Sequence, residues 1–248
     1  MRTFILSLFV LLILTSCKPE KNVLTAQQII DKSLEASQTP KVAQAELSFD
    51  FRGRTYIANR NNGTFSLFRI TRNDQDTISD ILSNKGFSRS INNKPVQVPD
   101  SMAIRYSESV NSVHYFSVLP FGLNDAAVNK KLLEEVAIKG KEYYKVQVTF
   151  DQEGGGVDFE DVFVYWISKE DFKIDYLAYL FHVNGGGKRF REVRKEHLIN
   201  GVRFVDYNNY KPKDTSIDVF SMDKAFENDE LEKVSEINLE NIELTFFN

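Results

Sequence analysis

Cysteine is nearly absent from this sequence, since Cys17 is the only one in 248 residues. One thiol excludes a disulfide within the chain, and it leaves no second cysteine to act as a catalytic nucleophile. The three histidines show no metal-ligand spacing, and the Gly-x-Ser-x-Gly motif of serine hydrolases is missing. From these absences we expect no cofactor and no bound metal, and no pattern favours an enzyme.

An apolar run long enough to cross a bilayer is missing at the N-terminus. The apolar stretch at residues 4–14 has eleven residues, whereas a membrane-spanning helix needs about 20. A charged residue, Arg2, precedes it and two small residues follow it, as in a secretory signal. The junction Leu14-Thr15-Ser16-Cys17 resembles the bacterial lipobox, in which the cysteine thiol takes a diacylglyceryl group and becomes the new amino terminus.

We therefore predict a lipoprotein signal peptide at residues 1–16, lipidation at Cys17 and a polar tether at residues 17–24. Two or three acyl chains make a lasting membrane anchor, because each buried methylene contributes about 0.8 kcal/mol. The alternative is a buried cysteine beside an ordinary cleavage site.

Strong charge of one sign is also missing. The formal net charge is −4, and no basic stripe favours a nucleic-acid partner. Residues 25–248 contain no linker rich in proline, glycine or serine, so we expect one domain over that range.

Alternation of apolar and polar residues dominates the chain from Ala45 onward. The pattern predicts nine to eleven strands, and Asn61-Asn62-Gly63 and Asn200-Gly201 mark two of the hairpin turns. Helical patterns cover residues 26–37, after a capping box that begins at Thr25, and residues 101–119. A weaker helix is predicted at residues 224–233. Because helices and strands are not interleaved, we expect an α+β fold, a curved antiparallel sheet with helices covering its concave face.

Aromatic residues are abundant, with twenty Phe, ten Tyr and one Trp. Most of them should form the core, but a curved sheet whose helices do not fill its hollow would leave an apolar slot. Groups such as Tyr56, Arg69 and Arg191 would form its rim. From strand alternation we predict that seven aromatic residues line this slot: Phe49, Phe51, Phe65, Phe68, Trp166, Tyr179 and Phe181.

Other polar features carry weaker signals. The glycine runs 154–156 and 185–187 precede strand patterns rather than helices, so we interpret them as hairpin tips and not as phosphate loops. Asp158, Asp161 and Asp175 could join His182 at a metal site, but the first two should face opposite sides of a strand. An enzyme acting on lipid or glycan could use Asp158, Asp161 or His114.

The order of lipobox, helix, antiparallel strands, helix and more strands resembles the LolA/LolB-like superfamily of envelope proteins. That resemblance implies an incomplete β-barrel closed by helices over an apolar cavity that holds acyl chains. Five stretches are also similar to a family of Bacteroidota outer-membrane lipoproteins of unknown function: FDFRGRTY (49–56), NSVHYFSVLPFGLND (111–125), EGGGVD (153–158), WISKEDFKIDYLAY (166–179) and GGGKRFREV (185–193).

The function expected from these patterns is that of a lipid-anchored envelope protein that binds a lipid or another apolar ligand. The resemblance implies the outer membrane, with the domain facing the periplasm. Two alternatives stay open: a scaffold with a filled core that recruits protein partners through a sheet edge, or the enzyme described above. No partner protein is identified by the sequence.

Overall fold

The computed structural model describes residues 23–154, 159–182 and 185–247. The predicted signal peptide, Cys17 and most of the predicted tether lie outside these residues, as does Asp158. Within the described ranges, no helix combines the length and the apolar character needed to cross a bilayer.

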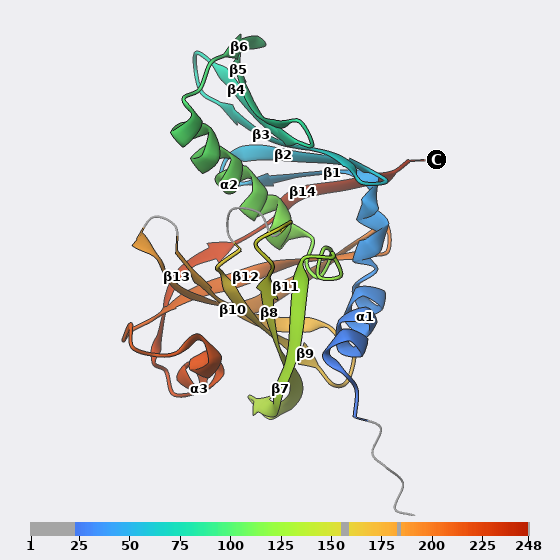
Figure 1. Cartoon of the computed structure of the whole chain (residues 1–248), viewed down its shortest axis with the longest axis vertical. Helices are drawn as coiled ribbons and strands as arrows, with labels where there is room; N and C mark the ends of the chain where they lie inside the picture. The colour runs from blue at the N-terminus through green and yellow to red at the C-terminus, as the bar shows by residue number, and fades with distance from the viewer. Residues whose placement is uncertain (1–22, 155–158, 183–184, 248) are drawn as a thin grey trace, which may run out of the picture.

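In the described part of the chain, fourteen antiparallel strands form two sheets of seven (Figure 1). The N-terminal sheet has the order β14-β1-β2-β3-β4-β5-β6. Its strands are β1 (Gln44–Phe51), β2 (Arg54–Asn61), β3 (Thr64–Arg72), β4 (Thr77–Ser83), β5 (Gly86–Ile91), β6 (Lys94–Val96) and β14 (Glu240–Phe246).

The C-terminal sheet has the order β13-β12-β11-β10-β9-β8-β7. Its strands are β7 (Val128–Ile138), β8 (Lys141–Phe150), β9 (Val162–Ser168), β10 (Ile174–Phe181), β11 (Gly187–Ile199), β12 (Val202–Pro212) and β13 (Leu231–Ile237). Each sheet is built of consecutive hairpins, apart from β14, which returns to pair with β1.

The two sheets meet where β13 passes into β14, and the far edges, β6 and β7, do not pair with each other. The barrel is therefore not closed. Helix α2 (Asp100–Ser117) connects those two far edges, so the chain must carry it across the concave side. Figure 1 shows α2 running between the sheets. The middle of the helix is fixed on the N-terminal sheet by Arg69, which pairs with Asp80 at 2.6 Å and donates to Ser109 Oγ at 2.6 Å.

The C-terminal sheet has two covered faces. On the face toward the hollow, called here the inner face, Val146, Tyr165 and Leu177 pack against α1 (Ala26–Ser37). On the opposite, outer face, a second cluster packs against the short helices η3 (Val219–Ser221) and α3 (Met222–Glu227). A further 3-10 helix, η1 (Thr39–Ala43), leads from α1 into β1.

The fold confirms the predicted α+β class and the antiparallel hairpins. Thr25 and Gln28 form the predicted capping box of α1. Asn200 and Gly201 have φ of 50° and 80°, the left-handed pair that a tight hairpin turn requires.

Three features differ from the sequence prediction. Strand β7 was not predicted, because a bulge between Leu132 and Glu135 breaks its alternation. The helix predicted at 224–233 ends at Glu227, and part of that range belongs to β13. Helix α3 covers the outer face, whereas the sequence pattern placed helices only on the concave side.

Candidate functional site

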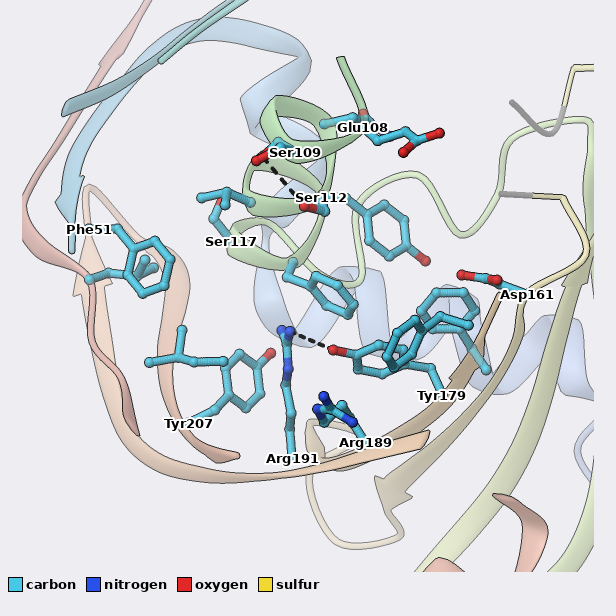
Figure 2. Close-up of a pocket in the computed structure, with 18 of the residues that line it drawn as sticks. Phe51, Glu108, Ser109, Ser112, Ser117, Asp161, Tyr179, Arg189, Arg191 and Tyr207 are labelled. Atoms are coloured by element: carbon cyan, nitrogen blue, oxygen red, sulfur yellow. Dashed lines mark hydrogen bonds between the residues drawn. The ribbon is translucent and has the colours of Figure 1, made fainter. Parts of the chain in front are cut away.

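A cavity of about 500 Å³ lies between the C-terminal half of α2 and the inner face of the C-terminal sheet (Figure 2). An engineered cavity of roughly 150 Å³ already holds benzene, and ligand sites span about 300–1,000 Å³. Eight aromatic residues line it: Phe51, Tyr115, Phe116, Phe150, Phe163, Tyr179, Phe181 and Tyr207. The aliphatic lining residues are Val113, Val205, Ile237 and Leu239. The remaining lining residues are polar or charged: Arg105, Glu108, Ser109, Asn111, Ser112, Ser117, Asp161, Arg189 and Arg191.

The apolar wall is centred on Phe163 of β9. Its ring centroid lies 5.5 Å from that of Tyr179, 5.7 Å from that of Phe150 and 5.8 Å from that of Tyr115. Such pairs favour a fixed ring geometry. The Tyr115 hydroxyl lies 2.9 Å from the Tyr165 hydroxyl, and burial raises the pKa of Tyr115 above its usual value. Both hydroxyls therefore stay neutral and leave the wall without charge at neutral pH.

The base of the cavity carries one buried cation, Arg191 of β11, which is 8% exposed. Its Nη2 donates to the Tyr179 hydroxyl at 2.9 Å, and its guanidinium carbon lies 3.7 Å from the Phe116 ring centroid. Figure 2 shows the Tyr207 hydroxyl pointing toward the same guanidinium. Burial raises the pKa of Tyr207, and the nearby positive charge of Arg191 opposes that shift. The Nε of Arg191 has no hydrogen-bond partner among the described residues.

The polar rim comes mainly from α2. Arg105, Ser109 and Asn111 are exposed, whereas the side chains nearer the C-terminal end of the helix, such as Ser117, are buried. Across the cavity, Asp161 lies 3.4 Å from Nδ1 of His182. The site is thus amphipathic, with exposed polar groups on α2 and aromatic groups beneath them.

The structure brings three of the seven predicted lining residues to the cavity, namely Phe51, Tyr179 and Phe181. Phe49 and Phe65 belong to the core between the N-terminal sheet and α2. Phe68 points to the opposite side of β3 from Leu67. It lies opposite Ile57 and Ile81 of the neighbouring strands and is half-buried there. These three residues do not line the cavity.

Trp166 lies on the outer face of the C-terminal sheet and is fully buried away from the cavity. Its Nε1 donates to Asp223 of α3 at 3.3 Å, and its ring packs against Phe190 at 5.5 Å between centroids. The prediction that it lines the slot was wrong because side chains alternate along β9, so the inward residues are Phe163 and Tyr165.

Two of the three predicted rim groups also lie elsewhere. Tyr56 is buried against Phe49, with ring centroids 5.4 Å apart, and Arg69 is paired with Asp80 under α2. The third, Arg191, faces the cavity.

His114 does not face the cavity. It belongs to α2 and is fully buried on the side of the helix that faces the N-terminal sheet, where its Nε2 lies 3.0 Å from the Phe68 carbonyl oxygen. Burial lowers the pKa of His114 to about 3, so it is neutral and donates its Nε2 proton to that carbonyl. A general base works best with a pKa near the operating pH, so this imidazole is unsuited to catalysis.

Of the residues considered for a metal site, Asp161 and His182 lie together, Asp175 lies elsewhere, and Asp158 is outside the described residues. Asp175 accepts hydrogen bonds from Lys141 and Tyr143 at 2.8 and 3.0 Å, whereas Asp161 lies beside His182. Among the described residues, no group of three or more histidine, cysteine, aspartate or glutamate side chains could hold a metal ion.

Sequence reasoning missed the residues that form most of the wall, in particular Phe116, Phe150, Phe163 and Tyr207. The alternation in β8 and β9 contained the necessary signal, because Val146, Val148 and Phe150 share one face of β8. Pairing then places Tyr165 opposite Val146 and Phe163 opposite Val148. The residues of α2 could not be placed without knowing that the helix crosses the hollow.

The sequence matches the model of a family of unknown function, DUF6503, over residues 2–239, so the chain belongs to that family. No curated protein matches the sequence.

Two solved structures share the fold. A LolA superfamily protein from Nitrosomonas europaea matches with a TM-score of 0.51 and 11% identity, covering 91% of this chain and 96% of that one. A DUF1329 family protein from Desulfovibrio piger matches with a TM-score of 0.50 and 11% identity, covering 89% of this chain and 93% of that one. At this identity the likeness shows the fold alone, which is LolA-like.

Proposed function

We propose that this DUF6503 protein is a lipid-anchored protein of the cell envelope whose half-barrel binds the acyl chain of a lipid or a similar apolar ligand. In this proposal Cys17 carries the anchor after removal of residues 1–16, and residues 25–248 form a single domain. The anchor holds it at the outer membrane, facing the periplasm. The lipobox-like junction and the LolA-like fold support that placement.

The observation that carries the proposal is the cavity of about 500 Å³ beneath α2, because its wall is mainly aromatic and aliphatic. Aromatic and aliphatic groups that line a cavity of this size stay in contact with water unless a ligand covers them, so burial of an apolar ligand there is favourable. An apolar wall with a few convergent polar groups is typical of small-molecule sites.

An acyl chain would bind here with useful affinity. Burial contributes about 0.8 kcal/mol per methylene, so ten to fifteen methylenes offer roughly 8–12 kcal/mol. Association costs at least about 4 kcal/mol. The remaining binding free energy is about 4–8 kcal/mol. At the upper end of that range the dissociation constant is about micromolar.

The two alternatives receive less support from the described residues. A scaffold would not require a cavity, and the free edge strand β7 carries Lys130, Lys131, Glu134 and Glu135, charges that discourage strand addition. An enzyme would require a base poised to titrate near neutral pH, and burial removes His114 from that role.

The test is to fill the cavity from α2. Ser112 is half-buried and lines the cavity, so Ser112→Trp places an indole in the ligand volume. We expect native mass spectrometry of gently purified wild-type protein to show bound lipid, and Ser112→Trp to retain less than about a tenth of it.

The matched control is Ile104→Trp, because Ile104 lies on the same helix, is 51% exposed and does not line the cavity. This variant should keep its lipid. Lipid retained equally by both variants, or absent from wild type, contradicts the proposal. The anchor is tested separately with Cys17→Ser, which should abolish labelling by radioactive palmitate and move the protein to the soluble fraction.

A further inference from the structure

Three arginines are buried in the described residues, and they differ in how their charge is compensated. Arg69 is 7% exposed and pairs with Asp80 at 2.6 Å. Arg203 is 4% exposed and pairs with Glu196 at 2.6 Å. Arg191 is 8% exposed, and no described carboxylate pairs with it. It is also the one of the three that lines the cavity.

The contacts that Arg191 does make are weaker than an ion pair. A guanidinium has five N–H donors, of which Nη2 donates to Tyr179 and Nε has no described partner. The Phe116 ring stabilises the cation from one side. The guanidinium carbon also lies 5.2 Å from the Tyr179 ring centroid and 5.8 Å from that of Tyr207. These ring contacts and one neutral hydrogen bond recover only part of what burial of a charge costs. The positive charge of Arg191 is therefore only partly compensated, and an anionic ligand would complete the compensation.

We propose that Arg191 binds a singly charged anionic head group on the acyl-chain ligand. The inference rests on the function proposed above and names the chemical class of its ligand. The guanidinium fork matches a carboxylate or a phosphodiester through paired N–H···O bonds. The Tyr179 hydroxyl accepts from Arg191, so its own proton is free to be donated to the same anion.

The charges of the cavity lining favour one negative charge in the ligand. Among the described residues that line the cavity, Arg105, Arg189 and Arg191 supply three positive charges, and Glu108 and Asp161 supply two negative charges. The remaining single positive charge matches the carboxylate of a free fatty acid or the phosphodiester of a phospholipid. The head group would lie at the base, beside Arg191, and the chain would lie along the rings around Phe163.

The experiment compares three probes on delipidated protein at pH 8, by equilibrium dialysis below their micellar concentrations. The probes are hexadecanoate, palmitoyl-lysophosphatidylglycerol and the neutral methyl hexadecanoate. We expect wild type to bind at least one of the two anions ten or more times tighter than the ester, which is about 1.4 kcal/mol. The anion that binds tighter identifies the source of the head group.

The variant Arg191→Met removes the charge and keeps an apolar side chain of similar length. It should bind hexadecanoate and the methyl ester equally, with the affinity for the ester unchanged within about threefold. The matched control is Arg60→Met, because Arg60 also has an unpartnered buried nitrogen but lies outside the cavity lining. Arg60→Met should keep the wild-type preference.

The outcomes separate the two proposals. Equal binding of the anions and the ester by wild type overturns the head-group inference and leaves an apolar site intact. Binding of none of the three probes overturns the proposed function as well. If Arg191→Met does not fold, the wild-type comparison decides alone, since it needs no variant.

Discussion

The two faces of the C-terminal sheet are made from similar residues but differ in what they enclose. Each face carries a cluster of aromatic side chains and a buried cation next to it, Lys145 on the outer face and Arg191 on the inner face. The outer cluster is solid: Phe190 packs against Phe226 of α3 with ring centroids 4.9 Å apart. The inner cluster borders a cavity of about 500 Å³.

The two cations differ in the same way. Lys145 lies 2.9 Å from Glu134, 3.2 Å from Asp223 and 2.6 Å from the Phe220 carbonyl oxygen, so its ammonium is fully compensated. Arg191 has a tyrosine hydroxyl and the faces of aromatic rings. Aromatic content therefore does not distinguish a core from a site. The distinguishing features are the unfilled volume and the uncompensated charge.

The largest expected effect that separates the faces is that of Trp166→Ala. The indole is fully buried and donates to Asp223, so its removal should lower the free energy of unfolding by about 3–5 kcal/mol. Urea denaturation measures this loss. In the fraction that stays folded, ligand affinity should be unchanged, because Trp166 does not line the cavity.

The matched change on the inner face is Phe181→Ala. Phe181 is half-buried and already faces the cavity, so the loss of stability should be about 1 kcal/mol or less. An equal loss from both variants would show that the two faces are packed alike, and the contrast drawn here would be wrong.

The second prediction concerns the buried cations. Asp223→Ala leaves Lys145 with a mostly exposed glutamate and one carbonyl, and breaking a buried pair costs about 3 kcal/mol. On the inner face, Arg191→Met should leave stability unchanged or raise it by about 1 kcal/mol, since no described ion pair is broken. Thermal or urea unfolding of both variants without ligand tests the contrast. A larger loss for Arg191→Met than for Asp223→Ala would assign Arg191 a structural role.

The sequence predicted the fold well where one face of a strand is polar. Ala45, Leu47 and Phe49 alternate with exposed or half-buried residues in β1, and all three are buried. In β9 every residue from Phe163 to Ser168 is buried, so alternation gives two equivalent registers and no indication of which face is inner. The choice between Trp166 and Phe163 depended on tertiary packing.

The candidate site was partly predictable for the same reason. Tyr179 and Phe181 share a face of β10 and were placed together, whereas Phe65 and Phe68 are three apart and cannot share a face of β3. Arg191 was expected at the rim. Its lack of a carboxylate partner could not be predicted, because it depends on which side chains the other strands bring near it.

The smallest of the three contrasts uses pH to distinguish the packing of α2 on the N-terminal sheet from the outer face of the C-terminal sheet. His114 of α2, which faces the N-terminal sheet, has its pKa lowered by burial from 6.5 to about 3. Below pH 6.5 the His114 imidazole is protonated in the unfolded chain. In the folded chain it stays neutral until the pH falls to about 3. Stability from this group is therefore present above pH 6.5 and is lost as the pH falls. The loss is about 1.4 kcal/mol per unit, or about 2 kcal/mol at pH 5.

His114→Gln isolates this contribution, because the glutamine amide can still donate to the Phe68 carbonyl but does not titrate. The free energy of unfolding should be measured by urea at pH 7.5 and pH 5 for both proteins. Between these two pH values, wild type should lose about 2 kcal/mol more than the variant. The rest of the chain is identical in the two proteins, so its contribution cancels in the difference. Hydrogen exchange at pH 5 should then increase first in α2 and in the strands beneath it, while the amides around Trp166 stay protected. If the free energy of unfolding depended equally on pH in the two proteins, the His114 imidazole would be protonated in the folded state at pH 5. The contacts that hold α2 over the cavity would then not be weakened by acid.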